Sequence, residues 1–244
     1  MVNKIKLCWR ALWRIDNWWK FFLDYLGCWY SHYTLRIKGK KVTIRGGSAD
    51  RRIVTEVVLL DKYFPQDIRL TGQSKVIDLG AHIGLFSVLC PGEVWAFEPD
   101  AFNFRILKMN AGKNMHIFNM AVADKDGKVK LYQGEHSARM STARKSLVPR
   151  TFEEVKAISL NSVFKKNKID HCDLLKCDIE GGEYDVLYNT PDAIFKKINA
   201  IIMETHTIPG ESQDLLVEFI RKKGFRIKRD GNFIVAKKSF WDKW

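Results

Sequence analysis

The stretch Lys75-Val-Ile-Asp-Leu-Gly-Ala-His-Ile-Gly-Leu-Phe-Ser-Val-Leu-Cys90 decides the fold of this chain. It begins with an apolar run that reaches Asp78, continues through small residues, and resumes at Gly84 with a second apolar run. This order predicts a buried strand, a tight turn and a helix that packs back on the strand. Because glycine has no side chain, a ligand can approach the turn closely, and the N–H groups at the helix start attract negative groups. The stretch therefore predicts a nucleotide-like ligand.

The next strand ends in an acidic residue where a ribose would lie. Residues 94–97 are apolar, Glu98 follows, and Pro99 cannot continue a central strand. Ligands of an open parallel sheet bind outside the carboxyl ends of its strands. A carboxylate there, about 20 residues after the glycine turn, can accept hydrogen bonds from both ribose hydroxyls. We therefore predict that Glu98 binds a ribose.

The glycine spacing distinguishes between two kinds of cofactor. Dinucleotide-binding domains show three glycines as GxGxxG, whereas this turn has Gly80 and Gly84, preceded by Asp78. S-adenosylmethionine (SAM) has a ribose and an amino-acid tail but no pyrophosphate, so the pattern favours SAM. The alternative is that both glycines serve packing alone and that Glu98 is a solvated charge at a strand end.

Composition narrows the classes of function. The 244 residues, 46% of them hydrophobic, suit one domain with an N-terminal addition. No apolar run reaches the ~18 residues that a membrane-spanning helix needs. Five scattered cysteines without a CxxC pair argue against a disulfide framework and a structural zinc site, so we expect a reducing cytoplasm. The net charge of +13 predicts an acidic partner: anionic lipid, nucleic acid or an anionic small substrate.

The N-terminal addition, residues 1–73, begins with an aromatic segment. Residues 4–26 carry a polar stripe at three- and four-residue spacing among aromatic and aliphatic residues, which predicts one amphipathic helix. Three roles stay open for it: a peripheral anchor at the inner membrane surface, an aromatic lid over a substrate, and a packed helix or dimer contact. A β-hairpin at residues 34–38 and 41–45 and a helix at residues 49–63 are predicted next.

From residue 74 to residue 244, strand and helix patterns alternate, which predicts an α/β fold with a mostly parallel sheet. The expected strands are residues 75–79, 93–98, 115–120, 171–177 and 199–204, with a short one at 128–133, and the expected helices are residues 84–90, 100–111, 184–197 and 212–223. Residues 136–155 are polar and basic without a clear period, and we expect a loop over the site. Asp230-Gly231 predicts a closing hairpin, and hence a final antiparallel strand.

A second group of charges follows the strand at residues 171–177. In Lys176-Cys-Asp-Ile-Glu-Gly-Gly-Glu183, positions 176, 178 and 180 alternate and so share one side of an extended chain. Three charges there would be costly inside a core, so we expect them at the carboxyl end of the strand. Glu204 and His206 end a neighbouring strand in the same way. We expect all these side chains to line the same cleft as Glu98.

The segments KVIDLGAHIGLFSVL, VWAFEPD, NMAVADKDGKVKLY, LLKCDIEGGEYDVL and IIMETH, in this order, resemble the FkbM family of SAM-dependent methyltransferases. The pair AFEPD and KCDIEGGE is the specific part of the match, which covers residues 74–206. The resemblance implies the Rossmann-like sheet of class I methyltransferases, here with an N-terminal helix and β-hairpin addition. It also implies O-methylation of a hydroxyl on a sugar, a glycan, a lipid-linked glycan or a secondary metabolite.

Carried over by position, the resemblance also implies cofactor-binding residues. The turn would lie beside the methionine part of SAM, and residues after the third strand would contact adenine. The implied set is Asp78, Gly80, Ala81, His82, Gly84, Glu98, Ala121 and Asp178. Asparagine is commoner in the family at position 82, and histidine can still form hydrogen bonds there.

Methyl transfer to a hydroxyl needs a base near the transfer point. His206 is the first predicted candidate, because an unperturbed histidine titrates near neutral pH, and Asp178 is the second. Lys176, Glu180 and Glu204 are predicted to position the acceptor. Asp178, Glu204 and His206 also offer ligands to a divalent metal, which is the less favoured alternative because their spacing does not require one.

Two other functions stay open. The positive charge and the basic segment 139–150 favour a nucleic-acid methyltransferase, but the chain has no Asn-Pro-Pro-Tyr motif. The other is a membrane-associated protein that binds SAM without catalysis. The intact Asp78, Gly80, Glu98 and Asp178 argue against such a loss of activity.

Overall fold

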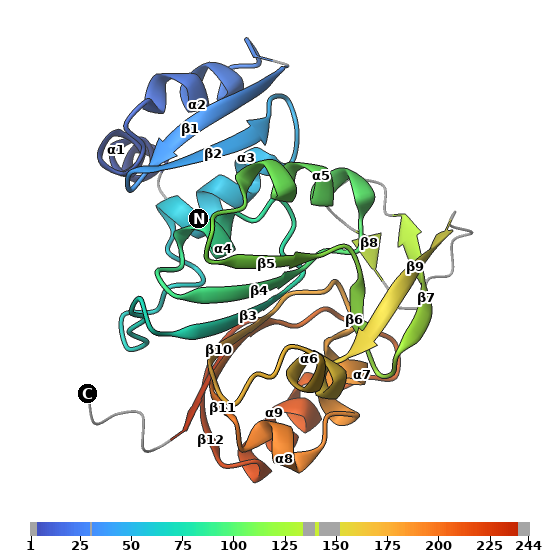
Figure 1. Ribbon diagram of the computed structural model, residues 1–244. Coiled ribbons are helices and arrows are strands. Elements are labelled where there is room, and N and C mark those ends of the chain that lie inside the picture. Colours follow the sequence, from blue (N-terminus) through green and yellow to red (C-terminus); the bar gives the residue numbers. More distant parts are fainter. Residues whose placement is uncertain (1–3, 30, 134–139, 142–151, 239–244) are drawn as a thin grey trace.

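Seven strands form the central sheet of the computed structural model, in the order β12-β13-β11-β10-β3-β4-β5 (Figure 1). They are β3 (Lys75–Leu79), β4 (Glu93–Phe97), β5 (Met115–Phe118), β10 (Cys172–Cys177), β11 (Ile198–Glu204), β12 (Phe225–Asp230) and β13 (Phe233–Lys238). The structure describes residues 4–29, 31–133, 140–141 and 152–238. Among the sheet's strands within these residues, β13 alone runs in the opposite direction to the other six. This topology confirms the predicted class I methyltransferase sheet.

Helices cover both faces of the sheet because strand side chains alternate between two apolar clusters. Val76 of β3 belongs to the cluster packed against α4 (Leu85–Leu89) and α5 (Ala101–Asn110). Ile77, the next residue, belongs to the cluster on the opposite face. That face is covered by α6 (Leu160–Lys166), α7 (Glu183–Tyr188), α8 (Asp192–Phe195) and α9 (Gln213–Lys222).

The N-terminal addition packs on the face that carries α4 and α5. It consists of α1 (Lys4–Arg14), α2 (Trp18–Tyr25), the hairpin β1 (His32–Ile37) and β2 (Lys40–Arg45), and α3 (Asp50–Val54), which continues as the π-helical turn η1 (Thr55–Leu59). In Figure 1 the hairpin lies between the helices α1 and α2 and the main sheet. Its buried residues join the same apolar cluster as α4 and α5. The division at residue 73, which stays a prediction, thus does not separate two cores.

The single helix predicted over residues 4–26 is wrong, because it is broken into α1 and α2. Ile15 is fully buried and forms a β-bridge with Ile37. The N–H of Asp16 donates to the carbonyl of Arg36 at 2.8 Å. These bonds to a strand edge replace helical ones, a tertiary effect that helical periodicity does not reveal.

Other predicted boundaries also differ. The helix expected over residues 184–197 splits into α7 and α8 because Pro191 cannot continue a helix, and the helix expected over 49–63 ends at Leu59. The loop expected over 136–155 is wrong at its end, where β9 begins, and most of it lies outside the described residues. β6 (Ala121–Ala123), β7 (Gly127–Gln133), β8 (Met140–Ser141) and β9 (Phe152–Ser159) form a second sheet in the order β6-β9-β7-β8. Among the strands of this second sheet, only β7 corresponds to a predicted strand, the one expected at residues 128–133. No helix is predicted where α6 lies.

Two composition-based expectations concern the cysteines and the helices. All five cysteines lie within the described residues and are free thiols, as their irregular spacing predicts. Among the helices that the structure describes, none combines the length and the apolar character needed to cross a bilayer.

Replacing Gly84 with alanine is expected to destabilise the chain. Gly84 has a φ angle of +80°, and an added Cβ would lie 2.4 Å from Cδ1 of Leu107. Both effects oppose the substitution, so the free energy of unfolding in urea should fall by about 2 kcal/mol.

Gly72→Ala is the matched control, because no described atom lies within 4 Å of its added Cβ. It should change the free energy of unfolding by less than about 0.5 kcal/mol. Equal losses in the two variants would contradict the steric account of Gly84.

Candidate active site

The glycine turn joins β3 to α4 at the carboxyl edge of the sheet. Gly80, His82 and Gly84 have φ angles of +77°, +52° and +80°. The N–H of Gly80 donates to the Phe97 carbonyl of the neighbouring strand β4 at 3.0 Å. A Cβ on Gly80 would lie 1.9 Å from the carbonyl oxygen of Asp178, so only glycine permits this close approach of the segment after β10.

A buried ion pair supports the turn. Asp78 is fully buried, and its two carboxylate oxygens accept from Lys176 Nζ at 2.9 Å and from Ser87 Oγ at 2.6 Å. The same ammonium donates to the carbonyl of Gly80 at 3.0 Å. Burial lowers the pKa of Lys176, but the charges of Asp78 and Asp178 outweigh burial and raise it overall. Lys176 thus supports the turn, and its predicted contact with the acceptor stays a prediction.

A cleft of about 80 Å³ lies beside the turn, where the cofactor is predicted. Five of the predicted cofactor residues line it, namely Gly80, His82, Glu98, Ala121 and Asp178. Asp78, Ala81 and Gly84 are not among its lining residues and instead build the turn. Seven further residues line the cleft that no sequence pattern marks as part of the site: Ile53, Phe97, Pro99, Asn103, Val122, Leu131 and Ile179. Val122 and Leu131 come from the second sheet, of which the family resemblance implies only Ala121 as a site residue.

Glu98 lies just after β4 and is 5% exposed. Its carboxylate accepts the backbone N–H of His82 at 2.8 Å and that of Asp100 at 2.9 Å. Burial raises the pKa of Glu98 to about 7, although these two bonds favour the charged form. A carboxylate at this strand end, facing a cleft, suits the ribose contact that the sequence predicts.

His82 is the polar side chain of the cleft that most clearly lacks a partner. Both ring nitrogens are buried, and neither has a hydrogen-bond partner among the described residues. Burial lowers the pKa of His82 to about 4, so at neutral pH the ring offers one donor and one acceptor. Because buried polar groups are normally satisfied, the ring fits a polar ligand such as the amino-acid tail of SAM. Its φ angle of +52° also accounts for asparagine being commoner here, because asparagine tolerates the left-handed region.

A second cavity, of about 390 Å³, adjoins the cofactor cleft. Ile53, Asp178 and Glu180 line both. We call it the acceptor cavity, after the role that the sequence predicts for Glu180 and Glu204. Its remaining lining residues are Arg52, Glu56, Glu204, Thr205, His206, Thr207 and Asn232. Four carboxylates therefore face one cavity in a chain whose net charge is +13.

The N-terminal addition reaches the carboxylates of this cavity, which the sequence analysis missed. The hydroxyl of Tyr63, a residue that is 3% exposed, donates to Asp178 Oδ2 at 2.7 Å. Lys62 Nζ lies 2.6 Å from Glu204 Oε2 and 3.4 Å from Glu56 Oε2. Burial raises the pKa of Glu204, but Lys62 outweighs burial and lowers it overall. No local pattern identifies these contacts, because Asp178 and Glu204 lie 115 and 142 residues from their partners in the chain.

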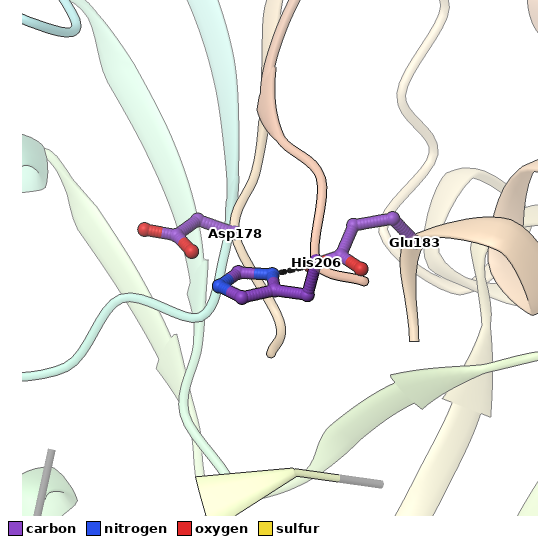
Figure 2. A group of neighbouring side chains, drawn as sticks. All are labelled: Asp178, Glu183 and His206. Carbon is purple, nitrogen blue, oxygen red and sulfur yellow. Dashed lines mark hydrogen bonds and ion pairs between the residues drawn. The ribbon is translucent and has the colours of Figure 1, made fainter. Parts of the chain in front are cut away.

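His206 is held between carboxylates (Figure 2). Its Nδ1 lies 3.0 Å from Glu183 Oε1, and its Nε2 lies 3.2 Å from Glu180 Oε2. Burial lowers the pKa of His206, but the hydrogen bond to Glu183 and the charges of Glu183, Glu180 and Asp178 outweigh burial and raise the pKa to about 9. At neutral pH the ring is therefore an imidazolium that donates from both nitrogens. This charge state opposes the predicted role of His206 as the base.

Glu180 is better suited than His206 to accept a proton from the acceptor. It lines both cavities, and its φ angle is +52°, in a region that residues other than glycine rarely occupy. Burial raises the pKa of Glu180 to about 7, although the charge of His206 lowers it. Backbone strain of this kind concentrates at functional sites, and a carboxyl group that titrates near neutral pH can accept a proton there.

The metal ligands predicted from the sequence are arranged differently in the structure. Asp178, Glu183 and His206 each bring one ligand atom within 4.8 Å of the others. Glu204, predicted in place of Glu183, is bound by Lys62. A cation bound by this set would have to displace the proton between His206 and Glu183. Without a cation, these charges form an ion-paired imidazolium.

The two histidines of the site, His82 and His206, are expected to lose their protons at widely different pH values. His82 should lose its proton near pH 4, because it is buried and its nearest carboxylate, Asp50, lies 4.0 Å from Nδ1. His206 should lose its proton near pH 9, because it is held between carboxylates. Imidazole ¹⁵N NMR over a pH series measures both values, and His82→Gln and His206→Gln assign the signals. A pKa of His206 near 6.5 would contradict the ion-paired state.

The same pKa of His206 predicts a pH dependence of stability. Because the folded-state pKa of about 9 lies above the unpaired value of 6.5, the stabilisation is complete below pH 6.5 and is lost as the pH rises through 9. The difference in unfolding free energy between the wild type and His206→Gln should therefore shrink over that range. A constant difference would count against the ion pairs.

Comparisons with known proteins give the family. Residues 78–227 match the family described as the methyltransferase FkbM domain. The chain is 25% identical over 232 residues to 31-O-demethyl-FK506 methyltransferase FkbM of Streptomyces tacrolimicus, a match that covers 80% of this chain and 89% of that protein. It is 24% identical over 223 residues to AMB antimetabolite synthetase AmbE of Pseudomonas aeruginosa, a match that covers 71% of this chain and spans 10% of that much longer protein.

Among solved structures, the METTL16 MTase domain aligns with a TM-score of 0.46 and 13% identity, over 76% of this chain and 68% of that one. Precorrin-6y C5,15-methyltransferase from Geobacter metallireducens aligns with a TM-score of 0.43 and 15% identity, over 71% of this chain and 85% of that one. The family domain covers more than half of the sequence, including the glycine turn and the strand ends that line both cavities. The chain therefore belongs to the FkbM family of SAM-dependent methyltransferases.

Proposed function

We propose that the chain transfers a methyl group to a hydroxyl oxygen of a sugar, a glycan or a similar polyol. The carrying observation is that the cofactor cleft adjoins a cavity lined by Glu56, Asp178, Glu180 and Glu204. Carboxylates accept hydrogen bonds from hydroxyl groups, so this cavity suits an acceptor rich in hydroxyls. The name of the S. tacrolimicus relative, a 31-O-demethyl-FK506 methyltransferase, also supports transfer to oxygen.

The same carboxylates weigh against a nucleic-acid acceptor. Phosphate groups would lie close to four acidic side chains and only two cations of the cavity wall, Arg52 and the His206 imidazolium, so repulsion would dominate. The basic segment 139–150, which favoured nucleic acid in the sequence, lies outside the described residues except for 140–141. An acceptor without phosphates at the reacting end therefore fits the cavity better.

In this proposal SAM occupies the cleft beside the turn. Glu98 would bind its ribose, His82 and the backbone of Gly80 would face the amino-acid tail, and Ala121 would contribute to the wall near adenine. Asp178 lines both cavities and so would lie near the transfer point. When bound, SAM supplies an electrophilic methyl group on its sulfonium.

The residues at the boundary of the two cavities must remove a proton, because a hydroxyl that gains a methyl group loses its hydrogen. We assign this role to Glu180, whose raised pKa of about 7 allows it to take up the proton. The imidazolium of His206, 3.2 Å away, would hold the carboxylate in place. Asp178, fixed by the Tyr63 hydroxyl, would orient the acceptor and is the second candidate base.

Glu98→Gln is expected to weaken SAM binding by about tenfold, because the amide has one hydrogen-bond acceptor oxygen instead of two and carries no charge. Isothermal calorimetry with SAM measures the affinity. Glu93→Gln is the matched control, since Glu93 begins the same strand at its opposite end. Unchanged affinity in Glu98→Gln would remove Glu98 from the cofactor site.

Transfer itself can be followed with SAM labelled in the methyl group. We expect label in the glycan or glycolipid fraction of a host extract, in a form that resists mild base, because methyl ethers survive treatment that cleaves methyl esters. Glu180→Gln should slow this labelling by about 100-fold or more while leaving the SAM affinity within about threefold.

Two outcomes would contradict the assignment. Labelling of RNA instead of the glycan fraction would replace the proposed acceptor class. Near-normal labelling by Glu180→Gln would exclude Glu180 as the base, and the same measurement on Asp178→Asn would then test the second candidate. His206→Gln provides a comparison, since a positioning role predicts a smaller loss than that of Glu180→Gln.

A further inference from the structure

The outer surface of α1 and α2 exposes an unusual number of large apolar side chains. Trp13 is 84% exposed and Trp9, one helical turn away, is 60% exposed. We define the aromatic face as the exposed large apolar residues of these helices and of the residue that follows α2: Trp9, Leu12, Trp13, Trp18, Trp19, Phe22, Tyr25 and Leu26. Patches of this kind mark interaction sites, because proteins that remain monomeric rarely leave them exposed.

An apolar cavity of about 350 Å³ lies within this face, between α1, α2 and η1. Leu12, Trp18, Phe22 and Tyr25 belong both to the aromatic face and to the wall of the cavity, so these four exposed residues border it. The other lining residues are Leu7, Cys8, Ala11, Phe21, Thr55 and Leu59. A cavity with so few polar groups suits a hydrocarbon chain better than a sugar.

Positive charge surrounds the aromatic face. Residues 1–45 contain ten Lys and Arg residues, of which Arg14 and Arg45 are ion-paired with Asp61 and Asp50, and only two carboxylates, Asp16 and Asp24. Asp24 is fully buried and accepts a hydrogen bond from Tyr33. The hairpin tip lies next to the break between α1 and α2, which the bridge from Ile15 joins to β1. This tip exposes three of the ten cations, Lys38, Lys40 and Lys41.

We propose that the aromatic face docks on an anionic lipid bilayer. Tryptophan and tyrosine side chains favour the boundary between headgroups and hydrocarbon, and nearby Lys and Arg residues are attracted to acidic headgroups. The apolar cavity would take part of one acyl chain. A second copy of the chain is a poorer occupant, because it would bring an equally basic surface against the first.

Docking of this face would place the acceptor cavity close to the membrane surface. The helix formed by α3 and η1 borders both cavities: Thr55 and Leu59 line the apolar one, whereas Arg52 and Glu56 line the acceptor cavity. Arg10 of α1 donates to the Leu59 carbonyl at 2.6 Å and so ties the aromatic face to this helix. This consequence for the acceptor rests on the proposed function, whereas docking itself does not.

Co-sedimentation of the full chain with lipid vesicles tests the proposal. The chain should pellet with vesicles of phosphatidylcholine and phosphatidylglycerol, and far less with pure phosphatidylcholine. The double variant Trp9→Ser, Trp13→Ser should bind the anionic vesicles about tenfold more weakly, because two interfacial anchors are lost. Phe102→Ser is the matched control, since Phe102 is 70% exposed but lies on α5, and it should bind like the wild type.

Calorimetry with SAM on the same proteins separates this inference from the proposed function. If the chain binds SAM but does not pellet with vesicles, the docking proposal is overturned and the methyltransferase proposal stands. If the chain pellets with vesicles but does not bind SAM, docking stands and the methyltransferase proposal is overturned. Equal binding to pure phosphatidylcholine would overturn the role of anionic lipid. A dimer in light scattering that Trp9→Ser, Trp13→Ser converts to a monomer, with no vesicle binding, would make the face a contact between copies of the chain.

Discussion

The buried ion pair between Asp78 and Lys176 is the interaction on which the site depends. It joins β3 to β10, and the same ammonium also holds the carbonyl of Gly80. Charges are tolerated in a core only when they are paired and hydrogen-bonded, so the strand ends cannot shift without exposing one of them. The pair thereby holds the glycine turn against Asp178, the residue shared by the cofactor cleft and the acceptor cavity.

Local and global charge have opposite signs in this molecule. The net charge of +13 predicts an acidic partner, yet the acceptor cavity is lined by four carboxylates. These observations agree if the acidic partner and the methyl acceptor are recognised by different surfaces. Lys62 and His206 neutralise part of the cavity, so that carboxylates from strand ends and from η1 can lie close together. Repulsion among them would otherwise oppose folding of the cavity.

The N-terminal addition completes the active site as well as covering the sheet. Tyr63 contacts Asp178, Lys62 contacts Glu204, and Ile53 lines both cavities. Sequence patterns predict its hairpin and helices, because alternation and turn residues are local properties. The break after α1 and the contacts of Tyr63 depend on partners far away in the chain, and local patterns do not contain that information.

The sequence by itself determined the family, the mostly parallel sheet with its final antiparallel strand and five residues of the cofactor cleft, because a glycine turn and an acidic strand end are local and chemically specific. Only the tertiary structure decided how the charged residues are paired and buried. His206 looked like a base by residue type, but two carboxylates keep it protonated, and burial moves the pKa of Glu180 toward neutrality instead. Lys176 looked like a substrate contact, but Asp78 holds it inside the sheet. Protonation and availability depend on which groups surround a side chain, and residues distant in the sequence supply many of those groups.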